Sequence, residues 1–354
     1  MTEMGNMIAA TTSRIFGDLG DVQALNNAAD DNWKGPLWSA LEEAGLTRAW
    51  VPEGLNGAGA GIADGFEVLR VAGSFAVSLP LAETLLAGWH LARAGLAVPA
   101  GALTVAPARG RDRIELNADG TLSGRAGAVP FARDAGHIAL LAVRGAQSVV
   151  ALVDRGQCRV DPGTSLAGEP CDNLQIERVK PVSLADAPAG IGQDELMLMG
   201  AAVRAMQMAG ALQAVLDCSV AYANERVAFD RPISKFQVIQ HNLARLAGEA
   251  AAALVAAGSA ADAIDSAKSF DEAVFLEIAS AKIRVGEAAG KGAAIAHQLH
   301  GAIGYSAEHV LHRYTQRLLA WRDDFGGESV WAVRLGKRVA ANGADALWPM
   351  LAAR

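Results

Sequence analysis

The densest group of residues that could do chemistry lies between Asn224 and Gln240, in the stretch NERVAFDRPISKFQVIQ. Arg226 and Arg231 place two guanidinium groups beside the expected start of a helix. The N–H groups and the dipole of a helix N-terminus favour an anion, and arginine adds planar, bidentate donors. We therefore predict a phosphate or pyrophosphate site here, although an ordinary corner between two helices explains part of the same stretch.

Local signals predict that corner. Pro232 cannot continue the preceding helix, which is expected to end near residues 226–229. Ser234 and Gln237 match a capping box, with Ser234 as the N-cap and Gln237 as the third helical residue.

Four of the seven histidines lie in or beside QLHGAIGYSAEHVLHRY, which ends at Tyr314; they are His297, His300, His309 and His312. Their spacing of three residues is typical of some metal sites. No set of Asp, Glu or Cys completes such a site, so we predict no metal. Gly301 and Gly304 favour the end of a helix with exposed histidines.

A glycine pair, Gly326-Gly327, precedes Glu328 and Ser329 at the expected start of the last long helix. Backbone N–H groups at such a start can donate to a ligand oxygen. An ordinary helix start explains the same residues, so both interpretations stay open.

The glycine-rich run PEGLNGAGAG, residues 52–61, does not follow a predicted strand. The G-x-G-x-x-G spacing and the following βαβ unit are also missing. We therefore do not expect this run to be the dinucleotide-binding loop of a Rossmann fold.

Three regions of different pattern must position these groups. Residues 1–100 have apolar positions three and four apart, which predicts a small helical domain. Residues 101–188 hold short apolar runs with a hairpin signal at Asp119-Gly120, which predicts a small β-barrel or sandwich. Residues 189–354 contain long helical patterns with short connections, which predicts an antiparallel four-helix bundle. The expected fold class is α+β, mostly α.

Bulk properties exclude several classes of protein. The chain of 354 residues has a formal net charge of −7 and no cluster of Lys and Arg, which argues against nucleic acid as a partner. Three cysteines and the lack of a signal peptide favour reduced thiols in a cytoplasmic protein. The most apolar segment, 79–103, is interrupted by charged residues and proline, so we expect no membrane span.

Two stretches resemble motifs of the acyl-CoA dehydrogenase family of flavoproteins. YANERVAFDRPISKFQVIQHNLARLAGE is similar in its Tyr, Arg, Pro-Ile and Phe-Gln positions, and QLHGAIGYSAEHVLHRYTQR in its Gln, Gly, Glu and Arg positions. The order of helical, β and helical regions agrees, and the resemblance covers about residues 35–345.

The resemblance implies FAD bound between subunits. Arg226 and Phe229 fall where the family contacts the FAD pyrophosphate and adenine, and Gln237 falls on the glutamine of the motif. The other implied contacts are Gln298, Gly301 and Ala302, which reach the same FAD from the neighbouring subunit, and Leu103 and Thr104, on the flavin side of the β-domain. Asp230 departs from the family pattern, which has glycine there.

The family reaction removes two hydrogens from an acyl-CoA substrate. A glutamate takes the α-proton, the flavin takes a hydride from the β-carbon, and electrons pass to an electron-transfer flavoprotein or a similar acceptor. The family places that glutamate at one of two positions, which align here with Gly326 and Gly200. Neither position carries a carboxylate.

Several hypotheses follow from this departure. Glu328 acts as a shifted base in FAD-dependent α,β-dehydrogenation of an acyl-CoA. Alternatively, the chain is a catalytically incomplete subunit that pairs with a catalytic homologue, as in family members that degrade steroids and other bulky acids. Different flavin chemistry and a flavin-free helical scaffold are further alternatives. The resemblance implies a homodimer, a homotetramer or a heteromer with a homologous subunit.

Overall fold

Helices form the N-terminal part of the computed structural model, which describes residues 3–107, 109 and 111–352. They are α1 (Glu3–Leu19), α2 (Val22–Asn26), α3 (Lys34–Glu43), α4 (Ile62–Phe75) and α5 (Leu81–Arg93), with short 3-10 turns η1 (Leu46–Arg48) and η2 (Glu53–Leu55) between α3 and α4. The apolar periodicity of this region therefore predicted α3, α4 and α5 correctly. The glycine-rich run 52–61 holds η2, and no strand occurs in residues 3–51, the described part of the chain before it.

Strands follow, and they form one hydrogen-bonded sheet in the order β6–β7–β3–β2–β4–β5–β8, with β1 paired in parallel to β4. Their bounds are β1 (Leu103–Ala106), β2 (Arg113–Leu116), β3 (Leu122–Pro130), β4 (His137–Arg144), β5 (Gln147–Asp154), β6 (Arg159–Asp161), β7 (Cys171–Val179) and β8 (Ser183–Asp186). The hairpin predicted at Asp119-Gly120 is confirmed, because it joins β2 to β3 and Gly120 has a φ of +80°.

Both faces of β4 and β5 are buried, which explains their continuous apolar sequences. Ile138 and Leu140 on β4 join the core of the sheet domain. Ala139 and Leu141 join the core formed by the helices, where α5 packs against the strands. Alternate residues of one strand therefore fasten the sheet to the helical part of the molecule.

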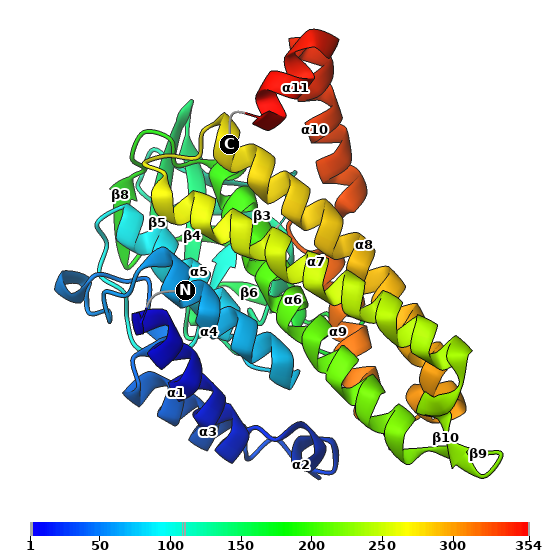
Figure 1. Cartoon of the computed structure of the whole chain (residues 1–354). Coiled ribbons are helices and arrows are strands. Elements are labelled where there is room, and N and C mark those ends of the chain that lie inside the picture. Colours follow the sequence, from blue (N-terminus) through cyan, green and yellow to red (C-terminus); the bar gives the residue numbers. More distant parts are fainter. Residues whose placement is uncertain (1–2, 108, 110, 353–354) are drawn as a thin grey trace.

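The C-terminal part is helical again. It contains α6 (Gln193–Glu225), α7 (Gln237–Ser266), α8 (Glu272–His300), α9 (Leu311–Asp323), α10 (Glu328–Asn342) and α11 (Ala344–Ala352), with the hairpin β9 (Val227–Ala228) and β10 (Arg231–Pro232) and the 3-10 turns η4 (Ile233–Lys235) and η5 (Gly301–Tyr305). Figure 1 shows α6, α7 and α8 side by side, as expected for the predicted bundle. The last long helix begins at Glu328, as predicted.

Two glycines let α4 approach α6 closely. A Cβ atom on Gly210 would lie 1.9 Å from the carbonyl oxygen of Arg70, and one on Gly73 would lie 2.1 Å from that of Gln207. No side chain fits at either position, so backbone contacts backbone at this crossing. The crossing joins the N-terminal helices to the bundle in one continuous core.

Helix α7 has an unusually exposed apolar surface. Within the described residues it is the one helix long and apolar enough to cross a membrane, and 28% of its most apolar window is buried. Val238, Leu254 and Val255 lie exposed on it. Figure 1 shows α7 on the outside of the bundle.

Candidate functional site

The β9–β10 hairpin follows directly from the end of α6, where Arg226 is the C-cap residue, as the position of Pro232 predicted. Phe229 and Asp230 form its tip, with φ angles of +53° and +64°. Positive φ at both tip residues is typical of a type I′ turn, which usually takes Asn or Gly. Phe229 is 90% exposed, so a strained tip presents an aromatic ring to solvent.

The capping box predicted for Ser234 and Gln237 is wrong. Ser234 lies in η4, and α7 begins at Gln237 with Phe236 as an N-cap that makes no side-chain hydrogen bond. The guanidinium of Arg231 lies 4.2 Å from the centroid of the Phe236 ring, which holds this residue before the helix. Among the described residues, no side chain caps the first turn of α7. The Ile239 N–H donates to the carbonyl oxygen of Phe236 at 3.0 Å, which leaves the N–H groups of Gln237 and Val238 for an anion.

The end of α8 lies at the same end of the bundle as the hairpin. Tyr222 on α6 donates from its hydroxyl to the carbonyl oxygen of His300, the last residue of α8, at 3.3 Å. The exposed residues at this end include six positions that the family resemblance selected: Arg226, Phe229, Gln237, Gln298, Gly301 and Ala302. The structure thus brings most of the predicted FAD contacts of this chain to one surface.

Leu103 and Thr104 lie apart from that surface. Both are fully buried in β1, and Figure 1 places the β9–β10 hairpin at the far end of the bundle from the sheet. The Thr104 hydroxyl donates to the carbonyl oxygen of Pro130 at 2.6 Å, and the Leu103 N–H donates to the Thr84 hydroxyl at 3.0 Å. Their hydrogen-bonding groups are used within the protein.

A cleft of about 590 Å³ lies between the sheet domain and the C-terminal helices. It contains the Gly326-Gly327 backbone, so it is the cleft beside which the family resemblance places a catalytic carboxylate. Other residues that line it include Arg109, Arg111, Ala128, Cys171, Asp194, Met197, Asp323, Asp324 and Arg334.

Glu328 does not line this cleft. One of its carboxylate oxygens lies 3.7 Å from Nε of Arg322. A Cβ atom on Gly286 of α8 would lie 3.1 Å from the other oxygen. The Glu328 carboxylate therefore lies beside α8 and Arg322, whereas the preceding residues Gly326 and Gly327 line the cleft.

The two positions where the family has its glutamate are sterically closed. Gly326 has a φ of +94°, and a Cβ atom there would lie 2.9 Å from Nε1 of the buried Trp331. A Cβ atom on Gly200 would lie 2.3 Å from the ring of Phe325. Phe325 therefore fills the space of a side chain at position 200, and position 326 adopts a conformation that strains any L-residue.

A buried ion-pair network borders the cleft. Arg204 on α6 contacts Glu83 of α5 at 2.6 Å and Asp324 at 2.9 Å, and it also donates to Gln207. Burial raises the pKa of Glu83, although Arg204 opposes this effect. Sequence reasoning did not select this network. A lone glutamate within the apolar residues of α5 was a signal for it, because a buried carboxylate needs a charged partner.

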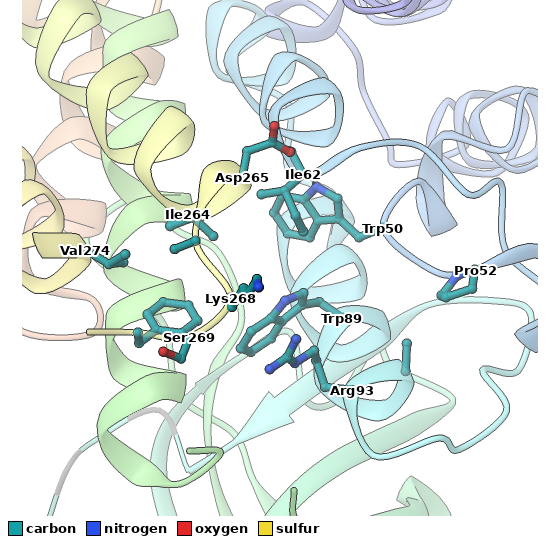
Figure 2. A pocket seen from close by; sticks show the side chains of 13 residues that line it. Trp50, Pro52, Ile62, Trp89, Arg93, Ile264, Asp265, Lys268, Ser269 and Val274 are labelled. Atoms are coloured by element: carbon teal, nitrogen blue, oxygen red, sulfur yellow. Dashed lines mark hydrogen bonds between the residues drawn. The ribbon is translucent and has the colours of Figure 1, made fainter. Parts of the chain in front are cut away.

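A smaller cavity of about 210 Å³ lies where α4 and α5 meet the connection between α7 and α8. Figure 2 shows Trp50 and Trp89 on its walls, with Arg93 and Lys268 nearby. It contains none of the predicted site residues.

Comparison with known proteins decides the family. The model for the acyl-CoA dehydrogenase C-terminal domain matches residues 193–329. Acyl-CoA dehydrogenase IpdE2 of Mycobacterium tuberculosis is 31% identical over 293 residues, which are 82% of this chain and 82% of that protein. The chain belongs to the acyl-CoA dehydrogenase family.

Solved structures agree with this assignment. A variant of the Tcur3481–Tcur3483 steroid ACAD has a TM-score of 0.83 at 25% identity and covers 96% of this chain and 98% of that chain. A chain of the ChsE4–ChsE5 complex from Mycobacterium tuberculosis has a TM-score of 0.85 at 22% identity, with 97% and 99% covered. The predicted order of helical, β and helical domains is thus the fold of this family.

FAD is the cofactor of the acyl-CoA dehydrogenase family, and the exposed end of the bundle fits its pyrophosphate and adenine. Arg226 offers planar donors, the uncapped first turn of α7 adds N–H groups, and Phe229 offers an open ring face. Leu103 and Thr104 are buried in β1 and offer no such surface. The exposed residues therefore fit the pyrophosphate and adenine of FAD, which are the half of the cofactor far from the flavin ring.

Proposed function

We propose that this chain is a subunit of a heteromeric acyl-CoA dehydrogenase whose homologous partner supplies the catalytic base. The assembly carries out FAD-dependent α,β-dehydrogenation of an acyl-CoA thioester, and an electron-transfer flavoprotein or a similar acceptor takes the electrons. The observation that carries this proposal is the closure of both glutamate positions, Gly200 by the Phe325 ring and Gly326 by its backbone conformation.

The carboxylates that do border the cleft are poor substitutes for a base. Asp324 is paired with Arg204 at 2.9 Å, and Asp194 lies 3.3 Å from Arg334. Asp323 lies 3.8 Å from Nε of Arg322. Each of these carboxylates is already engaged by an arginine, so it must leave that partner before it can reach a proton of the substrate. A base on the partner subunit removes this difficulty.

The role of this chain is then to hold FAD and to complete the assembly. Arg226 binds the pyrophosphate, and Phe229 stacks on the adenine from the exposed hairpin. FAD supplies the hydride acceptor when it is bound. Val238 and Val255 on α7 give the chain an apolar surface that a partner subunit can cover.

A second candidate function is a lone dehydrogenase with Glu328 as its base. The observation that favours it is the position of Glu328 directly after Gly327, which lines the cleft. This function requires the carboxylate to leave Arg322 and to turn from α8 toward the cleft.

Co-expression with a homologue that carries glutamate at one of the two family positions separates these functions. Turnover of acyl-CoAs of varied bulk, including steroid acyl-CoAs, is measured with an electron acceptor for the chain alone and for the complex. We expect turnover in the complex only, and no effect of Glu328→Gln on that rate. Turnover by the lone chain that Glu328→Gln abolishes would overturn the proposal.

The FAD-holding role is tested in the same complex by its visible flavin absorbance. Phe229→Ala and Arg226→Met should each lower the FAD content, because they remove the stacking ring and the pyrophosphate donor. Arg159→Met changes an exposed arginine of the sheet domain and serves as the matched control. Full FAD content in both hairpin variants would exclude this role.

A further inference from the structure

Cys218, His300 and His309 converge from three separate elements near the exposed end of the bundle. Cys218 lies on α6, His300 ends α8, and His309 lies between η5 and α9. One ligand atom of each lies within 4.8 Å of those of the other two. The sulfur of Cys218 and Nε2 of His300 are 3.9 Å apart, although 82 residues separate them in the chain. The fold thus supplies the cysteine that the histidine spacing alone lacked.

The ring of His300 is oriented for a ligand by its other contacts. Its Nδ1–H donates to the carbonyl oxygen of Ala296 at 2.8 Å, which leaves the Nε2 lone pair toward Cys218. Tyr222 stacks on the ring at a centroid distance of 4.4 Å. A backbone carbonyl that fixes the tautomer of a histidine is the usual outer-shell support of a metal ligand.

His309 is also a neutral ring with a lone pair. Its Nδ1 accepts a hydrogen bond from the Leu311 N–H at 3.1 Å, a bond that coordination through Nδ1 would replace. Burial lowers the pKa of His309, and it lowers the pKa of His300 to about 4.

We propose that Cys218, His300 and His309 bind Zn²⁺, with water as the fourth ligand, and that the ion fastens η5 to α6. Zn²⁺ takes mixed thiolate and imidazole ligands in tetrahedral geometry. Bonds of about 2.3 Å to sulfur and 2.0–2.1 Å to nitrogen place two such ligand atoms about 3.6 Å apart. The separation of 3.9 Å between Cys218 and His300 is already close to that value.

Metal titration of the complete, metal-free and tag-free chain tests this proposal. Zn²⁺ should raise the temperature of unfolding, and Co²⁺ should give the charge-transfer absorbance of a thiolate ligand. Cys218→Ala should abolish that absorbance and weaken Zn²⁺ binding more than about 100-fold, beyond the 10–100-fold expected for loss of an outer-shell partner. Cys158→Ala removes a buried thiol of the sheet domain and should leave the Co²⁺ absorbance and the Zn²⁺ affinity unchanged.

Three results would overturn the proposal. They are absence of any Zn²⁺ effect on the wild-type chain, thiolate absorbance that persists in Cys218→Ala, and full affinity in His309→Ala. Far-ultraviolet circular dichroism of each variant without metal separates loss of binding from loss of fold. None of these readouts depends on FAD or on turnover, so the proposed function can fail without affecting this result.

Proton release gives an independent measurement. A cysteine binds Zn²⁺ as a thiolate, so its thiol releases a proton when the sulfur–zinc bond forms. The affinity for Zn²⁺ should therefore rise as the pH increases. An affinity that does not change with pH would exclude a thiolate ligand.

Discussion

Arg204 is buried between helices and shares its charge with Glu83 and Asp324. Its removal would leave a carboxyl group in an apolar environment without its cation. We expect Arg204→Met to lower the free energy of unfolding by about 3–5 kcal/mol, measured by chemical denaturation at neutral pH.

Arg144→Met is the matched control, because Arg144 pairs with Asp186 on the surface, where both side chains are about half exposed. It should lower the free energy of unfolding by no more than about 1 kcal/mol. Replacement of both Glu83 and Arg204 by apolar residues should cost less than Arg204→Met alone. If Arg204→Met and Arg144→Met lower the free energy of unfolding equally, the expected effect of burial is contradicted.

The resemblance selected six residues that lie exposed at one end of the bundle and two, Leu103 and Thr104, that are buried in β1. Arg226 and Phe229 stand out in the sequence because charge and aromatic character interrupt a helical pattern. Arg204 and Phe325 act through partners distant in the sequence, so neither residue has a local signal. Cys218 likewise comes from another helix than His300, so no local pattern in the sequence links these two side chains.

At the scale of elements, Lys282 joins α8 to the end of α9. Its ammonium group donates to the carbonyl oxygens of Trp321 and Arg322 at 2.9 and 3.0 Å. Burial lowers the pKa of Lys282 to about 7. The carbonyls at the C-terminus of α9 would otherwise lack a donor.

This pKa predicts how stability changes with pH. Between about pH 7 and 10.4, the unfolded chain binds a proton at Lys282 that the folded chain does not, so its contribution to stability rises with pH. The rise is at most about 1.4 kcal/mol per pH unit, and it is absent outside this window. We expect Lys282→Met to remove this rise. The measurement is the free energy of unfolding of wild type and variant by chemical denaturation at several pH values. Lys291→Met, at an exposed position of the same helix, should keep the wild-type slope.

Element ends were predictable where one residue decides them. Asp119-Gly120 makes a hairpin through the backbone alone, and α6 ends with its C-cap at Arg226, within the predicted range and six residues before Pro232. The capping box failed because packing of Arg231 on Phe236 delays the start of α7. A contact between residues five positions apart, across the 3-10 turn η4, thus outweighed the capping pattern.

At the scale of the whole molecule, the proposed function assigns the exposed apolar residues of α7 to the contact with a partner subunit. Val255 is 72% exposed on the outside of the bundle. We expect Val255→Lys to weaken association with the partner subunit about tenfold or more, because a charge would be buried at the contact. Sedimentation or native mass spectrometry measures the assembly.

Val182→Lys places the same charge on an exposed valine of the sheet domain and should leave the mass of the assembly unchanged. Unfolding of each lone chain should also remain unaffected, since neither valine belongs to the core. If Val255→Lys assembles as wild type does, another face of the molecule makes the contact.

The ring of Phe325 against Gly200 has a consequence for how this protein can change over time. A glutamate at position 200 requires a smaller residue at position 325 as well, and one at position 326 requires a different local backbone and room beside Trp331. No single substitution therefore recreates the lost group in its old place. Under the proposed function, the dependence of this chain on its partner is entrenched, and the two must be inherited and produced together.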